Sequence, residues 1–222
     1  MSKEALYLVH HADLDPAMLA DWMAFQAKEH VPLVVKHGGF LGATRFRHLP
    51  LDPPKFTSCY RAANLAVVRT YLEGGEVGKM RAHLDDWIAG RRVNVSREIL
   101  EENYSVDGDG KPLARTPELS TGRAAFVVRV RVDPSYAGTW SVWYDRDHMP
   151  DVVRKGSFSR AGRWRIVDEA AGQARFLIVY EAPSADTVAA FRAGPGPDFG
   201  KEHEQKFGAA VTVEQREVWS AG

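Results

Sequence analysis

Hydrophobic and polar positions form short β-rich runs separated by helical stretches, and the same order of runs occurs twice along the chain. Alternating or continuous apolar runs predict strands, whereas apolar positions spaced by three to four predict helices. The predicted strands span residues 5–12, 40–48, 56–62 and 93–100 in the first half, and 124–132, 158–167, 175–181 and 210–219 in the second.

Two helical regions lie between the strands of each half. The first begins at an Asp-Pro step, residues 15–16 and 133–134, which is a favourable helix start. It is expected to run to about Val31 or Met149, where the following proline should kink or end it. The second covers residues 64–90 and 184–207, with a Gly/Pro interruption at residues 74–75 and 194–197. Each half is therefore predicted to be a βαββαβ unit.

The repetition is also visible in the residues themselves. Residues 22–47 match residues 140–165 without a gap, at a constant offset of 118, and ten of the 26 paired positions are identical. An offset of this length is about one small domain, too long for a solenoid repeat. The chain is thus predicted to contain two tandem copies of one domain.

The predicted fold class is α+β, with two tandem ferredoxin-like βαββαβ units forming a pseudo-twofold α+β barrel. A four-stranded sheet with helices on one face needs a cover for the other, and a second sheet can supply it. The stretch Asn103–Gly122 is rich in Gly, Pro, Asp and Ser and is predicted to be a linker outside both sheets. The expected domains are residues 1–102 and 123–222.

Composition narrows the function classes. Acidic and basic residues balance at 29 each, so no global field attracts nucleic acid or an acidic membrane. Cys59 is the only cysteine, which excludes an internal disulfide and a cysteine-cluster metal site. No apolar stretch approaches the 18 or so residues of a membrane span, and no secretory leader is visible. We expect a soluble cytoplasmic protein.

The pattern W-x(7)-H-x-P-x-V-V-x(2)-G-x-F-x(2)-A-x-R, on a helix that runs into a second strand, resembles the EthD-like branch of the dimeric α+β barrel superfamily. The resemblance covers nearly the whole chain apart from the linker. It implies a small-molecule pocket lined by the first helix, in a superfamily that includes cofactor-free isomerases, cyclases, monooxygenases and lyases, and also haem-binding relatives. Because one fold hosts many reactions, the reaction must be argued from the site.

The His-x-Pro step carries the candidate chemistry. His30 and His148 are expected at the end of a helix, where the C-terminal dipole would raise the pKa of an imidazole. Each has an aromatic neighbour eight residues before it on the same helical face, which suits acid–base work on an apolar oxygenated compound. The competing interpretation is a histidine that only caps a freed carbonyl beside a core tryptophan.

Further candidates come from the strands. His10, His11 and Arg45 are candidate catalytic residues beside the two helix histidines, although adjacent strand residues point to opposite faces. No metal site is expected, because His10 and His11 cannot converge on one ion by themselves. The remaining histidines, His83 and His203 among them, are expected at the surface or on a helix face. The candidate substrate-binding residues are Trp22, Tyr7, Tyr60, Trp140, Trp143, Tyr144 and Arg163, each with a core or ion-pair role as the alternative.

The predicted function is a cofactor-independent lyase, isomerase or cyclase that uses histidine acid–base chemistry on a small hydrophobic, oxygenated, aromatic compound. The alternative is a non-catalytic small-molecule or haem-binding protein, with His30 or His148 as the axial ligand. The first half is slightly favoured because only it has His10 and His11. A small-molecule substrate is the expected partner, with homodimerisation left open. No nucleotide-binding or zinc-protease motif is present.

Overall fold

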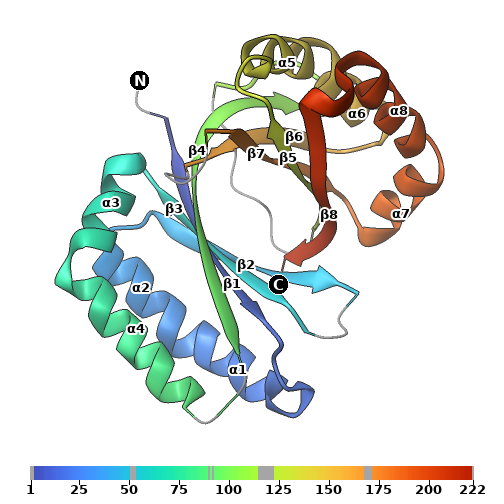
Figure 1. Ribbon diagram of the computed structural model, residues 1–222. Helices are drawn as coiled ribbons and strands as arrows, with labels where there is room; N and C mark the ends of the chain where they lie inside the picture. Colours follow the sequence, from blue (N-terminus) through green and yellow to red (C-terminus); the bar gives the residue numbers. More distant parts are fainter. Residues whose placement is uncertain are drawn as a thin grey trace. The chain divides into compact units, whose positions relative to one another are not determined.

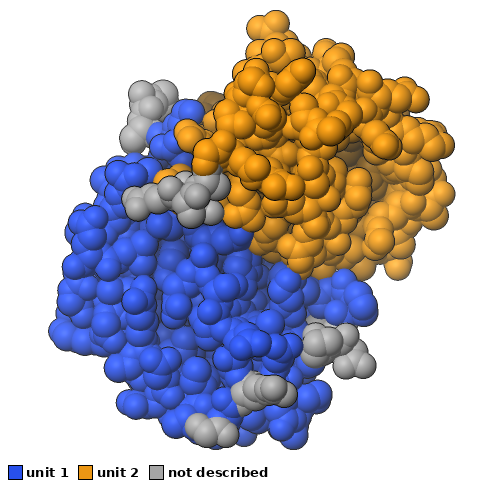
Figure 2. Space-filling model, viewed as in Figure 1, with its two compact units in different colours: residues 1–101, 222 blue, residues 102–221 orange. Residues whose placement is uncertain are grey.

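A computed structural model describes residues 3–50, 54–89, 91, 93–114, 123–167 and 172–221. The chain divides into two compact units (Figure 2). Unit 1 comprises residues 1–101 and 222, and unit 2 comprises residues 102–221.

Unit 1 contains one antiparallel sheet with helices against one face (Figure 1). The sheet has the order β4-β1-β3-β2, with β1 (Ala5–Ala12) between β4 (Asn94–Asp107) and β3 (Phe56–Ala62), and β2 (Gly42–Leu49) beside β3. The helical segments are a 3₁₀ turn (Pro16–Met18), α1 (Leu19–Phe25), a π-helical turn (Gln26–His30), α2 (Val31–Gly38), α3 (Leu65–Glu73) and α4 (Gly75–Ile88).

Unit 2 repeats this arrangement in the order β8-β5-β7-β6. Its strands are β5 (Ala124–Val132), β6 (Arg160–Ile166), β7 (Ala174–Ala182) and β8 (Val211–Ala221). Its helical segments are α5 (Ala137–Trp143), a π-helical turn (Tyr144–His148), α6 (Met149–Lys155), α7 (Ala185–Ala193), α8 (Gly196–Phe207) and a 3₁₀ turn (Gly208–Ala210). The predicted α+β fold class, with two tandem ferredoxin-like units, is confirmed.

The two sheet faces have different chemistry. On the helix side, the strands contribute apolar residues to a core in each unit, among them Tyr7 and Val9 in unit 1 and Phe126 and Val128 in unit 2. On the other face, charged residues pair across neighbouring strands of the same sheet, as Arg129 does with Glu217 at 3.1 Å. The face opposite the helices thus carries cross-strand ion pairs.

The first helix of each unit does not end at the His-x-Pro step, which corrects the sequence-based expectation. The helix continues for another two turns, as α2 and α6. The turn before the proline widens to a π-helix, in which the N–H of Val31 donates to Gln26 and that of Met149 donates to Tyr144. The proline then takes an early position of the next segment, where its lack of an N–H is tolerated. His30 and His148 therefore lie inside a helix, not at its C-terminal end.

The predicted linker is shorter than expected. Strand β4 continues to Asp107, through five residues assigned to the linker, because Tyr104 and Val106 favour extended backbone and Val106 is fully buried. A turn follows, in which the N–H of Asp107 donates to Lys111. Residues 115–122 of the predicted linker lie outside the described residues. Within the described part of the chain, no helix has the length and apolar character needed to cross a bilayer.

Candidate functional site

Each unit brings two histidines together, one from the first helix and one from the last. In unit 1 the rings of His30 and His83 stack with their centroids 5.6 Å apart, and in unit 2 those of His148 and His203 lie 5.7 Å apart. His203 lies on a helix face, one of the two positions expected for it, and its side chain is buried rather than at the surface. The spacing alone offered a signal: residues 83 and 203 differ by 120 (203 − 83), close to the offset of the repeat.

A cavity of about 450 Å³ lies in unit 2 beside its histidine pair. This volume is within the range of pockets that bind small organic molecules. The cavity lies between the sheet and the helices, and its lining is mostly apolar with a few polar groups. The apolar lining residues are Phe126, Val128, Val130, Val152, Phe191, Phe199 and Val213, and the polar ones include Tyr144, His148, Tyr180, His203 and Arg216.

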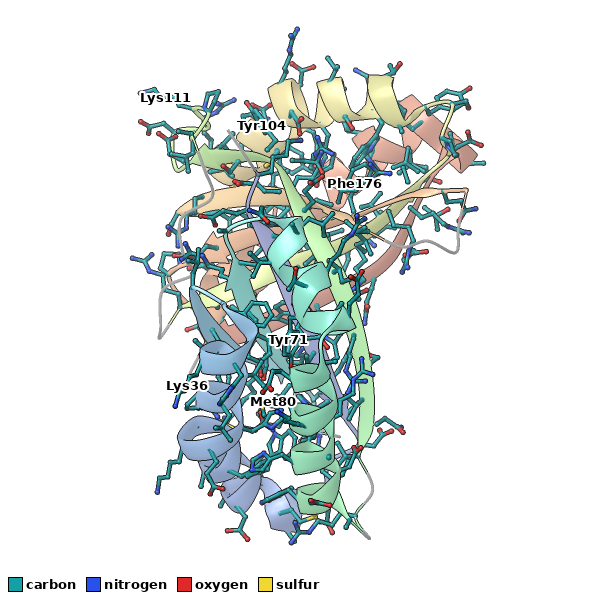
Figure 3. The ribbon with its side chains drawn as sticks, turned by 90° about the vertical axis from the view of Figure 1, so that its left-hand side faces the viewer. Lys36, Tyr71, Met80, Tyr104, Lys111 and Phe176 are labelled. Atoms are coloured by element: carbon teal, nitrogen blue, oxygen red, sulfur yellow. The ribbon has the colours of Figure 1, made fainter. Side chains whose placement is uncertain are left out.

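The corresponding place in unit 1 is nearly filled, with a cavity of only about 20 Å³. The lining positions of α4 and α8 are related by the offset of 120, which pairs Met80 with Gly200 and Leu84 with Glu204. Figure 3 shows Tyr71 and Met80 among the side chains that crowd between the helices of unit 1. A methionine where unit 2 has a glycine is therefore a direct cause of the difference.

The tautomer of His203 follows from its neighbour. The indole Nε1–H of Trp140 donates to Nε2 of His203 at 2.8 Å. An indole can only donate, so Nε2 must accept and the ring proton of neutral His203 lies on Nδ1. Burial, followed by the charge of the nearby Arg216, lowers the pKa of His203 to about 4. His203 is thus a neutral ring whose remaining polar group is a donor.

His148 is more deeply buried than its helix position suggested. Its ring packs against Trp143 at 4.6 Å and Tyr144 at 4.8 Å between centroids. Its Nδ1 has no hydrogen-bond partner among the described residues, and the Glu202 carboxylate is 3.7 Å away. Burial, followed by the charge of His203, lowers the pKa of His148 to about 3. The expected rise from a helix dipole is wrong, because desolvation dominates and the helix does not end there.

Two tyrosines form a polar pair in the cavity wall. The hydroxyls of Tyr144 and Tyr180 are 2.7 Å apart, so one donates to the other. Burial raises the pKa of both phenols, which keeps them protonated. The two hydroxyl groups carry two protons, and one of these forms the hydrogen bond between the tyrosines. No protein acceptor for the second proton is found among the described residues. The pair can therefore donate one hydrogen bond to an oxygen of a bound molecule.

Three cations lie at the outer part of the cavity: Arg192, Lys201 and Arg216. A β-bulge in β8 brings Val213 to the same face as Arg216, which pairs with Val128. The pairing of β5 with β8 shifts between Arg129 and Val130, so Glu214 is an extra residue. The bulge lets Val213 and Arg216, three residues apart, line the same cavity.

The two strand histidines of unit 1 point to opposite faces, and of the two only His11 lies on the side of His30, whose charge adds to burial in lowering the pKa of His11. His10 points to the other face of the sheet, where Nδ1 contacts Thr57 at 2.7 Å and Nε2 contacts Glu98 at 2.9 Å. His11 points to the helices and packs on Trp22 at 4.7 Å, with neither ring nitrogen bonded to a described residue. The strand registers pair Val9 with Arg97 and Val128 with Arg216. His10 and His11 therefore correspond to residues 129 and 130 of unit 2.

The predicted arginines lie outside the cavity. Arg45 donates to the backbone carbonyl of Met23 at 3.1 Å. Arg163 makes a bidentate ion pair with Asp145, at 2.8 and 2.7 Å, and its guanidinium lies over Phe176. Neither guanidinium lines either cavity. Both make structural contacts, which was the alternative to a role in binding.

The predicted aromatic residues divide between core and cavity. Trp22, Trp140 and Trp143 are buried against the histidines without lining a cavity. Tyr7 and Tyr60 line only the small cavity of unit 1, whereas Tyr144 lines the large one. Among the described residues, no group of three or more His, Cys, Asp or Glu side chains is placed to hold a metal ion.

Comparison with protein families gives one match, over the unit that has the cavity. A family described as "Domain of unknown function (DUF4286)" matches residues 123–219. No curated protein matches the chain.

Solved structures match over the full length at low sequence identity. An anthrone oxidase-like protein is 13% identical with a TM-score of 0.67, and the match covers 100% of this chain and 92% of that chain. A candidate monooxygenase from Fusobacterium nucleatum is 9% identical with a TM-score of 0.60, covering 100% and 94%. A candidate chlorite dismutase is 12% identical with a TM-score of 0.59, covering 100% and 95%. The chain is thus similar in fold to these proteins across its whole length.

Proposed function

We propose that unit 2 binds a small hydrophobic, oxygenated aromatic compound in its cavity and acts on it by histidine acid–base chemistry without a cofactor. The observation that supports this most is the convergence of two neutral imidazoles and a tyrosine pair on one apolar cavity of about 450 Å³. An apolar pocket with a few convergent polar groups is the usual form of a small-molecule site.

The contacts suggest a division of roles. His203 has its Nε2 occupied by Trp140, so it serves as a donor through Nδ1. His148 is the base, because it is neutral and lines the cavity, whereas its buried Nδ1 lies 3.7 Å from the Glu202 carboxylate. Proton removal from a phenol or carbon acid would leave an anion beside the new imidazolium, and this attraction raises the pKa of His148 during the reaction. The tyrosine pair would donate to the oxygen that becomes negative.

The similar structures are consistent with this class of ligand. One is described as anthrone oxidase-like and another as a candidate monooxygenase, and both names refer to chemistry on small organic molecules. At 9–13% identity the likeness shows the fold, so the proposal depends on the side chains of unit 2.

The tyrosine pair gives a direct test with 2-naphthol and 2-methylnaphthalene, two ligands of similar size. In the double variant Tyr144→Phe/Tyr180→Phe, we expect the affinity for 2-naphthol to fall about 3–10-fold, the usual value of a neutral hydrogen bond. Binding of 2-methylnaphthalene should stay within about twofold. Fluorescence titration measures both. Tyr60→Phe, at the unit 1 position that corresponds to Tyr180, is the matched control. Equal losses for both ligands, or none, would count against the proposal.

Haem binding is the second candidate function, because a neutral histidine beside a cavity is also the form that ligates iron. His148 lines the cavity and is neutral, which makes it the residue that would hold haem. Adding haemin and recording the Soret band separates the two candidates. A stoichiometric band that disappears in His148→Gln would replace the acid–base proposal, whereas no band would leave it in place.

A further inference from the structure

The outer part of the unit 2 cavity has an excess of positive charge. Arg192, Lys201 and Arg216 line it with a single carboxylate, that of Glu204. Lys201 is 3.5 Å from the exposed Asp198. For Arg192 and Arg216, no ion pair with a carboxylate is found among the described residues. An arginine facing an apolar cavity without a counter-ion is suited to bind an anion.

Two further features favour an anion at the same place. The first residues of α8, Gly196 and Pro197, line the cavity, so the positive end of a 12-residue helix faces it. Arg216 pairs with Val128, whose side chain lines the cavity, and therefore faces the cavity, whereas Arg129 and Arg131 pair with carboxylates on the opposite face. The cavity therefore has apolar walls, a polar inner end with His148 and the tyrosine pair, and a cationic outer end.

We propose that the substrate is an aromatic carboxylic acid, and that Arg216, assisted by Arg192 and Lys201, binds its carboxylate while the ring system enters the apolar part. This inference rests on the proposed function and names its substrate class. The carboxylate fixes the orientation of the molecule. The far end of the ring system, which bears the reacting oxygen, is then directed towards His148 and the tyrosine hydroxyls.

The test compares 2-naphthoate with 2-naphthalenemethanol, which has a similar shape and no charge. Wild-type protein should bind 2-naphthoate at least about tenfold more tightly than the alcohol. Arg216→Gln should remove this preference, with about a tenfold or greater loss for 2-naphthoate and little change for the alcohol. Arg97→Gln is the matched control, because Arg97 has the same position in unit 1 beside the nearly filled cavity.

The possible outcomes distinguish a failure of the carboxylate assignment from a failure of the proposed function. If the alcohol binds and 2-naphthoate has no advantage, or if Arg216→Gln weakens both equally, the carboxylate assignment is overturned and the proposed function stands. If neither ligand binds the wild-type cavity, the proposed function fails with it. A circular dichroism spectrum and a melting curve for each variant establish that the losses do not come from unfolding.

Discussion

Replacing His148 by glutamine is expected to lower turnover by about 10²–10⁴-fold, the usual contribution of a positioned acid–base group. The structural reason is that, of the two described histidines that line the unit 2 cavity, His203 already accepts a hydrogen bond from Trp140 and His148 does not. Turnover would be measured on a substrate found by screening oxygenated aromatic carboxylic acids. Because glutamine keeps most of the side-chain volume, the melting temperature should change by only a few degrees.

His30→Gln is the internal control, since the same helix position recurs there beside a cavity of only about 20 Å³. We expect its turnover to stay within about twofold of the wild type. Equal losses at both positions, matched by equal losses of stability, would instead support a purely structural role for the two histidines. A selective loss in His30→Gln would transfer the site to unit 1, the half that the sequence slightly favoured.

The free energy of unfolding is expected to fall steeply as the pH drops from 6.5 towards 4. Burial lowers the pKa values of His11 and His148 to about 3, and those of His30 and His203 to about 4. Below pH 6.5 the unfolded chain therefore binds protons that the folded chain does not, so acid favours unfolding. Each of these histidines contributes up to about 1.4 kcal/mol per pH unit in this window, and the full stability returns above pH 6.5. Urea unfolding at pH 7.0, 5.5 and 4.5 measures the change.

His11→Val isolates one part of this effect. Valine is the residue at the corresponding position of unit 2, Val130, and neither ring nitrogen of His11 has a hydrogen-bond partner among the described residues. The variant should be more stable at pH 7 by about 1–3 kcal/mol, the usual cost of an unsatisfied buried polar group. It should also lose less stability at pH 4.5 than the wild type does. A destabilised variant with an unchanged pH dependence would contradict the burial argument.

The sequence predicted the elements well, because strands and helices depend mainly on local pattern. The strands at residues 5–12, 56–62 and 124–132 have the predicted bounds. The His-x-Pro step was harder: the rule that proline ends a helix overlooked a π-helical turn, which removes the conflict between Pro32 and the preceding carbonyl. The EthD-like assignment stays a prediction, because the structural likeness reaches the fold and not the branch.

The site was harder to predict from the sequence, because it depends on how the helices and strands pack together. The pairing of His203 with His148 depends on how α8 lies against α5 and α6, and no local pattern reveals it. The preference for the first half relied on His10 and His11, and strand register separates those rings. The cavity itself depends on Gly200, which appears in the sequence only as one glycine within a helix. The effect of Gly200 on the cavity is evident only by comparison with Met80, which occupies the corresponding position of unit 1.

The central claim is that the unit 2 cavity is the binding site and that unit 1 contains a filled copy of it. The most direct measurement is a fluorescence titration of wild-type protein and of Gly200→Met with 2-naphthol. The nearest atom to a Cβ at Gly200 is 3.9 Å away, so methionine can enter the cavity, and a helix interior favours it over glycine by about 0.8 kcal/mol. We expect one site per wild-type chain, an affinity loss of roughly 100-fold or more in Gly200→Met, and unchanged binding in the unit 1 control Met80→Ala. Unchanged binding in a folded Gly200→Met protein, or a loss confined to Met80→Ala, would contradict the account.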